Sequence, residues 1–260
     1  MDKIQKIVLI GAGNLATQLG LALHEHGVII MQVYSRTMSS ANLLAEKVQA
    51  EAIVDLKEIT PQADLYIFSV KDDALLQVLQ QCSLFDKVLV HTAGSIDMNI
   101  LQDFSSNYGV FYPLQTFSKS RKVDFKAIPF CIEASSDKCR QQLKQLARLL
   151  SSDVRDVDSM QRQSIHLAAV FVCNFVNYMY NVGFDLMQQH DLNFDLLKPL
   201  IMETAQKVMH TNPWEAQTGP AVRYDEQVMN KHLDFLDKQK QLKELYSFVS
   251  KQIFNKHQNK

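Results

Sequence analysis

The chain has 260 residues, of which 47% are hydrophobic and 21% charged, and its formal net charge is -1. This composition is typical of a globular protein with one large or two modest domains, and the balanced charge excludes a general attraction for nucleic acid or membranes. The four cysteines form no CxxC pair, so we expect reduced thiols in a cytoplasmic protein, with no metal site. No apolar run approaches about 18 residues, so neither an export signal nor a membrane span is expected.

A glycine-rich turn follows the first apolar run of the chain. Ile7 to Ile10 is typical of a short buried strand, and a helical pattern begins after Gly13. Gly11 allows a tight turn, Gly13 lets the backbone approach a pyrophosphate, and Ala16 lets the helix pack closely on the strand. The amides at the helix start, at Asn14 and Leu15, can then bind the phosphates. The pattern favours a dinucleotide site; the alternative is a flavodoxin-like turn that binds no dinucleotide.

The second expected strand, Val28 to Tyr34, is followed by Ser35, Arg36 and Thr37. An NAD-binding fold usually carries an acidic residue here, which would repel a 2′-phosphate. Ser35 and Thr37 can instead donate hydrogen bonds, and the Arg36 guanidinium can pair with a phosphate or stack on adenine. We therefore expect NADP(H) rather than NAD(H). The alternative for Arg36 is an ordinary surface position in a charged loop.

Two further apolar strands end in small and hydroxylated residues. Leu65 to Val70 ends in Ser69 and Val70, and the strand Val88 to His91 is followed by Thr92, Ala93 and Gly94. Ligands of doubly wound sheets lie beyond the carboxyl ends of the strands, so both segments are expected to face the nicotinamide. His91 itself is open between a role at the cofactor and a packed position at the strand end.

Strands and helices alternate as far as about residue 156. The expected elements are a helix capped by Ser39 or Ser40, a strand over 52–54, strands over 109–112, 129–133 and 154–157, and a helix over 137–150. We therefore predict an α/β fold, a Rossmann-type doubly wound, mostly parallel sheet over residues 1–156. An all-α domain over 157–260 would follow it and serve substrate binding and dimerisation.

The expected helical domain begins with one long apolar stretch, residues 161–190, which we interpret as a buried central helix. Helices over 193–209, 228–235 and 242–254 follow. Between them, Thr218 to Asp225 forms a polar, turn-rich segment. Arg223 in this segment could bind a substrate carboxylate, or it could pair with Asp225 or another acid.

Five stretches carry a resemblance to a known group of proteins. They are GAGNLA at 11–16, HTAGS at 91–95, FYPLQTF at 111–117, HLAAVFVCNF at 166–175 and TGPAVRYD at 218–225. The chain resembles NADP oxidoreductases with a Rossmann-like domain and a helical carboxy-terminal domain of unknown function. These belong to a superfamily that includes 6-phosphogluconate dehydrogenase-like, pyrroline-carboxylate reductase-like and ketopantoate reductase-like proteins. The resemblance implies fold and cofactor, and names no substrate.

The resemblance also suggests where a proton could be exchanged. His166 lies where ketopantoate-type and hydroxyacid-type reductases carry a lysine, and Asn174 is eight positions further along the same expected helix, about 12 Å away along its axis. Both could instead be buried polar residues that satisfy their neighbours. Tyr112 stands where related sequences often have histidine. Because the ordinary pKa of a phenol is far above that of an imidazole, we expect Tyr112 to be a hydrogen-bond donor rather than a proton carrier near neutral pH.

Together these observations predict an NADP(H)-dependent oxidoreductase that transfers a hydride to or from a carbonyl or imine of a small polar metabolite. A homodimer is expected, with no nucleic acid or membrane partner. Two alternatives stay open. One is an NADP(H)-binding sensor or interaction protein without turnover, and the other is a deazaflavin-linked NADP oxidoreductase.

Overall fold

A computed structural model of the chain describes residues 3–258. The chain divides into two compact units, Met1–Met179 and Tyr180–Lys260. The first holds the β-sheet and the long helix as far as Met179, and the second is wholly helical.

The first unit is built on one eight-stranded sheet with the order β3-β2-β1-β4-β5-β6-β7-β8. β6 and β7 pair antiparallel, and every other neighbouring pair is parallel. The order β3-β2-β1-β4-β5-β6 is that of a dinucleotide-binding fold, whose direction of winding reverses between β1 and β4. The expected Rossmann-type sheet is therefore confirmed. Its strands are β1 (Lys6–Ile10), β2 (Ile29–Tyr34), β3 (Glu51–Ile53), β4 (Leu65–Phe68), β5 (Val88–His91), β6 (Asn107–Pro113), β7 (Phe130–Ala134) and β8 (Val154–Asp156).

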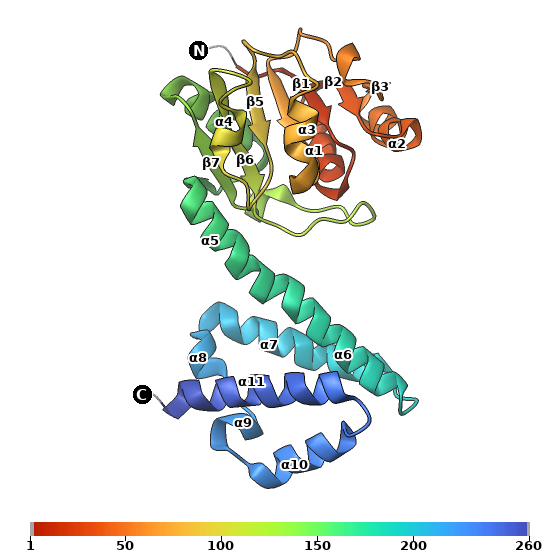
Figure 1. Ribbon diagram of the computed structural model, residues 1–260, viewed down its shortest axis with the longest axis vertical. Helices are drawn as coiled ribbons and strands as arrows, with labels where there is room; N and C mark the ends of the chain where they lie inside the picture. Colours follow the sequence, from red (N-terminus) through yellow and green to blue (C-terminus); the bar gives the residue numbers. More distant parts are fainter. Residues whose placement is uncertain (1–2, 259–260) are drawn as a thin grey trace. The chain divides into compact units, whose positions relative to one another are not determined.

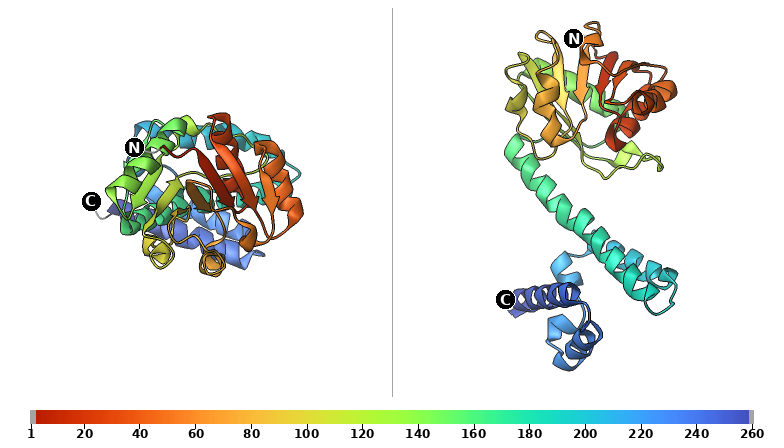
Figure 2. Two further views of the ribbon diagram at one scale, coloured as in Figure 1. Left: turned by 90° about the horizontal axis from the view of Figure 1, so that it is seen from above. Right: turned by 45° about the vertical axis from the view of Figure 1, so that its right-hand side comes forward.

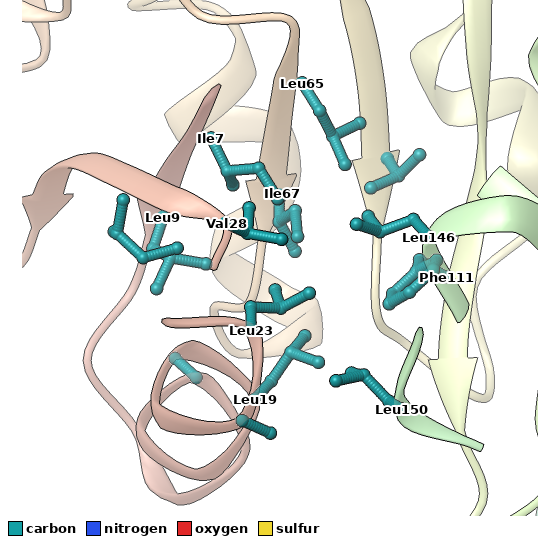
Figure 3. Close-up of a cluster of buried hydrophobic side chains, with 14 of the residues drawn as sticks. Ile7, Leu9, Leu19, Leu23, Val28, Leu65, Ile67, Phe111, Leu146 and Leu150 are labelled. Carbon is teal, nitrogen blue, oxygen red and sulfur yellow. The ribbon is translucent and has the colours of Figure 1, made fainter. Parts of the chain in front are cut away.

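Helices cover both faces of this sheet (Figure 1, Figure 2). The period of two along β1 explains why, since Ile7 and Leu9 point to one face while Val8 and Ile10 point to the other. The first face packs on α1, α2 and α4, through residues such as Leu19, Leu23, Leu146 and Leu150 (Figure 3). The second face packs on α3 and η3, through Leu75 and Leu101. The helices are α1 (Asn14–Glu25), α2 (Met38–Val48), α3 (Leu75–Leu79) and α4 (Asp137–Leu150), with short 3-10 turns η1 (Leu56–Glu58), η2 (Asp72–Ala74), η3 (Met98–Leu101) and η4 (Phe125–Ala127).

The start of α2 differs from expectation. Ser39 and Ser40 do not cap the helix; the cap is Thr37, whose side-chain oxygen accepts a hydrogen bond from the Ser40 amide at 3.4 Å. Thr37 has the extended backbone that an N-cap needs, whereas Ser39 and Ser40 already lie inside the helix. The chain thus turns into α2 directly after Arg36.

The long helix is interrupted once. It consists of α5 (Ser159–Ala169), a π-helical segment (Val170–Phe175) and α6 (Val176–Gln188). The expectation of a buried central helix is wrong for the single chain, because only its first turns pack on the sheet and side chains such as Phe171 and Val172 are exposed. Ser159–Gln188 is also the one helix among the described residues that is long and apolar enough to cross a membrane by length and composition. None of its most apolar 18-residue stretch is buried.

The second unit continues with η6 (Phe194–Leu197), α7 (Lys198–His210), α8 (Pro213–Ala216), α9 (Pro220–Arg223), α10 (Glu226–Phe235) and α11 (Lys240–Gln258). Aromatic contacts join α11 to the preceding turns, with the rings of Tyr224 and Phe254 4.5 Å apart. Of the described residues 180–258, only Ala221 and Leu236 are buried. The unit therefore has helical structure with almost no apolar core of its own.

Candidate functional site

The glycine turn joins the ends of three strands. Gly11 has φ +124°, a conformation that side chains rarely adopt, and its amide donates to the carbonyl of Tyr34 at 2.9 Å. A Cβ atom at Gly11 would lie 2.2 Å from the carbonyl oxygen of Ser69. The ends of β1, β2 and β4 therefore meet at a position that only glycine fits.

The first turn of α1 is open to a ligand. Gly13 is its N-cap and has extended backbone, no side chain caps the helix, and a Cβ at Gly13 would meet nothing within 4 Å. The first helical backbone bond is donated by Thr17 to Gly13, so the amides of Asn14 and Leu15 are left for another acceptor. Free amides at a helix start beside an uncrowded glycine fit a pyrophosphate.

The segment after β2 carries a free cation. Arg36 is exposed, and among residues 3–258 no hydrogen bond or ion pair engages its guanidinium. The Ser35 amide donates a hydrogen bond to the Ile53 carbonyl at 3.2 Å, and Thr37 caps α2. The hydroxyl of Thr37 still has its hydrogen to donate while its oxygen accepts from Ser40. The group around Arg36 has the donors that a 2′-phosphate requires.

The ends of β4 and β5 lie beside the glycine turn. The Ser69 amide donates to Ile10 at 2.8 Å, and the Thr92 amide donates to Phe68 at 3.1 Å. The Thr92 hydroxyl lies 3.5 Å from the same Phe68 carbonyl, so it faces β4. Ser69, Val70 and Ala93 are partly exposed at this edge.

His91 is a packed residue of the strand end. It has no exposed surface, and its Nδ1 accepts a hydrogen bond from the Ala93 amide at 3.1 Å. Burial lowers the pKa of His91 to about 3, and the nearby positive charge of Arg162 adds to this effect. The imidazole is therefore neutral at physiological pH, which favours the structural alternative.

Tyr112 and His166 form the main polar contact at this edge of the sheet. The Tyr112 hydroxyl, at the end of β6, lies 3.2 Å from Nδ1 of His166 on α5, and the two rings meet edge to face. Burial raises the pKa of Tyr112, so the phenol stays protonated at neutral pH. A hydroxyl can donate to a neutral imidazole and accept from a protonated one, so Tyr112 can hold the ring in both states. Nε2 has no hydrogen bond among the described residues and is left for a ligand.

Gly94 allows His166 to come this close. A Cβ atom at Gly94 would lie 2.5 Å from Nδ1 of His166 and 3.0 Å from its Cβ. The loop after β5 therefore touches the imidazole directly through its backbone. One residue further on, the Ser95 hydroxyl is hydrogen-bonded to the carboxylate of Asp72, which joins this loop to the one after β4.

Asn174 is not brought into contact with His166. It lies in the π-helical segment, is exposed, and has no hydrogen bond to His166 among the described contacts. In a regular α-helix the side chains of two residues eight positions apart point about 80° apart around the helix axis. The π-helical segment reduces this angle, because it has more residues per turn.

Arg223, from the other candidate segment, is exposed in the second unit, where Asp225 caps α10.

The comparison with known proteins decides the family. A crystal structure of a Bacteroides fragilis protein, described as a candidate NADP oxidoreductase, has 52% sequence identity and a TM-score of 0.93, covering 97% of this chain and 98% of that one. The chain belongs to this family of NADP oxidoreductases. Residues 6–94 match the family described as NADP oxidoreductase, coenzyme F420-dependent, and residues 128–253 match a domain of unknown function, DUF2520. Use of a nicotinamide cofactor follows from the family.

More distant structures share the fold of this NADP oxidoreductase. A Thermotoga maritima protein is 22% identical over 97% of this chain and 98% of its own, with a TM-score of 0.72. A reductive aminase from Aspergillus terreus is 14% identical over 99% of this chain and 93% of its own, with a TM-score of 0.66. A glutamyl-tRNA reductase from Idiomarina loihiensis is 38% identical over 66 residues, and the match spans 16% of that protein.

Sequence reasoning missed two residues next to the candidate site of the oxidoreductase. Arg162 is completely buried and pairs with Glu133 on β7. The only signal was the spacing, since Arg162 lies four positions before His166 and so shares its helix face. A long polar side chain near a helix start is ordinarily interpreted as exposed, which is why the pair was not predicted.

Proposed function

We propose that this NADP oxidoreductase transfers a hydride between NADP(H) and the carbon of a C=O or C=N bond in a small polar metabolite. The observation that carries the proposal is the pair Tyr112 and His166, held against Gly94 at the carboxyl edge of the sheet. This is the edge at which doubly wound folds bind the reactive end of a cofactor.

The cofactor is proposed to lie across the ends of β2, β1, β4 and β5. Gly11, Gly13, Asn14 and Leu15 would receive the pyrophosphate on free backbone amides. The unpaired Arg36, with Ser35 and Thr37, would bind the 2′-phosphate and select NADP(H) over NAD(H). The nicotinamide would lie near Ser69, Val70, Thr92, Ala93 and Gly94.

His166 is the proposed proton donor and acceptor. The nicotinamide supplies or takes the hydride, so the protein has to provide orientation and one proton. In the reducing direction, Nε2 of a protonated His166 gives that proton to the oxygen or nitrogen of the substrate. The positive charge then leaves the ring, and Nδ1 keeps its hydrogen bond to Tyr112 throughout. Asn174 is a second candidate contact for the substrate, one that would need the substrate to extend along the helix.

We further propose that residues 157–260 form a substrate and dimerisation domain, and that two copies of the chain associate through it. The single chain leaves Leu167, Phe171 and Val172 more than half exposed, and the second unit buries almost nothing. Exposed apolar surface of this extent marks an interface. A second copy offers equally apolar helices, and two-fold association is the commonest form of oligomer. Light scattering should give the mass of a dimer, and Phe171→Glu should give a monomer; stable insertion into lipid vesicles instead would refute the dimer.

A deazaflavin-linked reaction is the second candidate. It is favoured by one observation, the match of residues 6–94 to the coenzyme F420-dependent family. That segment holds the nucleotide-binding turn, which this candidate shares with the first. Hydride transfer from NADPH to an oxidised deazaflavin, or from a reduced deazaflavin to NADP+, would be visible as a change in deazaflavin absorbance. In this reaction the deazaflavin would take the place of the metabolite as the hydride partner.

The cofactor part is tested by calorimetric titration with NADPH and NADH. Arg36→Ala should weaken NADPH binding about 10- to 100-fold, the value of a charge-assisted contact, and leave NADH binding unchanged. Arg148→Ala, an exposed arginine on α4, is the matched control. Binding of neither cofactor by the wild type would overturn the proposal.

The catalytic part is tested by NADPH oxidation with a panel of small carbonyl and imine compounds. His166→Ala should reduce turnover about 100- to 10,000-fold with cofactor affinity retained, as is typical of general acid-base residues. NADPH binding without any turnover by the wild type would favour a sensor without catalysis.

A further inference from the structure

Arg162 is the largest fully buried side chain among the described residues. Its two terminal nitrogens both have partners. Nη1 donates to the carboxylate of Glu133 on β7, and Nη2 donates to the carbonyl of Ile96 and to the hydroxyl oxygen of Ser159. A fully desolvated guanidinium is therefore held by three acceptors from three parts of the first unit.

Glu133 and Ser159 complete the network. The Ser159 amide donates to Oε1 of Glu133 at 3.0 Å, and its hydroxyl donates to Oε2 at 2.8 Å. The Met98 amide in turn donates to the Ser159 hydroxyl oxygen at 3.0 Å. The hydrogen bonds thus join β7, the segment after β5 and the first turn of α5.

A buried ion pair is weak evidence of a contribution to stability, because the desolvation of two charges offsets most of their attraction. An apolar pair of similar volume would fill the same space. The pair instead fixes the orientation of the groups around it, since a forked guanidinium binds its partners at defined angles.

This fixed orientation affects His166, because Arg162 and His166 are one turn apart on the same face of α5. Arg162 binds the carbonyl of Ile96, and His166 touches Gly94, two residues earlier in the same loop. Two successive turns of α5 are therefore fixed on one short loop, and the second turn carries the imidazole that meets Tyr112.

We infer that Arg162 is a positioning residue, which acts through Glu133 and the Ile96 carbonyl to hold His166 in hydrogen-bond reach of Tyr112. The inference rests on the proposed role of His166. Burial, Cys131 on β7 and Asp72 after β4 raise the pKa of the Tyr112 phenol, and the nearby guanidinium of Arg162 opposes them.

The test compares Arg162→Met with Arg155→Met, which removes an exposed arginine on β8 that pairs with Asp153. Nitrogen-15 NMR of the histidine rings reports the hydrogen bond at Nδ1 of His166 without any need for turnover. In Arg162→Met we expect loss of that signature, a fall in kcat of about 10-fold or more and an NADPH affinity within about twofold of wild type. Arg155→Met should match the wild type in all three.

Two further variants cover a failure of Arg162→Met to fold. Arg162→Lys keeps the charge and loses the fork, and Arg162→Met combined with Glu133→Leu removes both charges together, so neither leaves an unpaired buried carboxylate. A folded variant of either kind with wild-type His166 signals and kcat would overturn the inference. If the NMR signature is lost while the wild type itself shows no turnover, the proposed reaction fails and the positioning role of Arg162 stands.

Discussion

The hydroxyl oxygen of Tyr112 lies 3.2 Å from Nδ1 of His166, although 54 positions separate the two residues in the chain. The contact joins the last residues of a strand to the second turn of the long helix. Tyr112 is too weak an acid to carry protons at neutral pH, but through this contact it orients the imidazole of His166. Nε2 of that ring then stays free for a ligand.

Tyr112→Phe removes only this hydroxyl. We expect kcat to fall about 2- to 10-fold, the value of one neutral hydrogen bond, with NADPH affinity unchanged. Tyr108→Phe on the same strand is the control, because its hydroxyl is bonded to Asn99 and not to the site. Steady-state kinetics of both variants provide the measurement, and equal losses in the two would show that the Tyr112 contact is unimportant.

Gly94→Ala places a methyl group into the imidazole of His166. Since the Cβ of His166 is also within 3.0 Å, rotation of the ring alone cannot relieve the contact and α5 has to move. We expect a fall in kcat of about 10-fold or more, together with a lower melting temperature. Gly183→Ala, where the nearest side-chain atom is 3.7 Å away, should leave turnover intact. Unchanged turnover in Gly94→Ala would contradict the described approach of helix and loop.

Gly11→Ala and Gly13→Ala should separate folding from cofactor binding. Alanine at Gly11 would combine a strained positive φ with contact to the Ser69 carbonyl, so we expect a loss of at least about 2 kcal/mol in unfolding free energy. Alanine at Gly13 has ordinary φ and open space, so stability should hold while NADPH binding weakens. Denaturant titration and calorimetry distinguish the two; unimpaired NADPH binding by Gly13→Ala would place the pyrophosphate elsewhere.

The lowered pKa of His91 predicts how the unfolding free energy depends on pH. Its folded pKa of about 3 lies below the ordinary value of 6.5, so below pH 6.5 the unfolded chain binds a proton that the folded protein does not. The unfolding free energy should therefore fall as pH is lowered from about 6.5 towards 3, with a loss from this group of about 2 kcal/mol between pH 7 and 5. His91→Gln, which never ionises, should lack this part of the slope in urea titrations at several pH values. An equal slope in both proteins would mean that His91 titrates normally.

Local patterns predicted the Rossmann-type half of the protein well, and α4 and β5 have the expected bounds. A strand, a glycine turn and an apolar helix are specified by neighbouring residues, because strand burial and helix periodicity are short-range properties. The cap of α2 was misplaced by two or three residues for a related reason. Three hydroxyl residues, Thr37, Ser39 and Ser40, compete there, and the direction of the incoming chain selects among them.

The long helix shows the limit of such reasoning. Its apolar residues predicted burial, yet Phe171 and Val172 are exposed in the single chain. Apolar character predicts that a side chain is buried, but it does not show whether the same chain or another molecule buries it. The π-helical segment over Val170–Phe175 was also not foreseen, since no local sequence rule marks a change from 3.6 residues per turn.

The sequence by itself determined the sheet, the glycine turn and the absence of an acidic residue after β2, because each depends on residue types close together in the chain. The tertiary structure alone decided that Tyr112, Gly94 and His166 meet, and that Arg162 is buried against Glu133. These contacts join residues 29 to 72 positions apart. They arise because the first turns of α5 pack against β6, β7 and the loop after β5, and no short stretch of sequence encodes such packing.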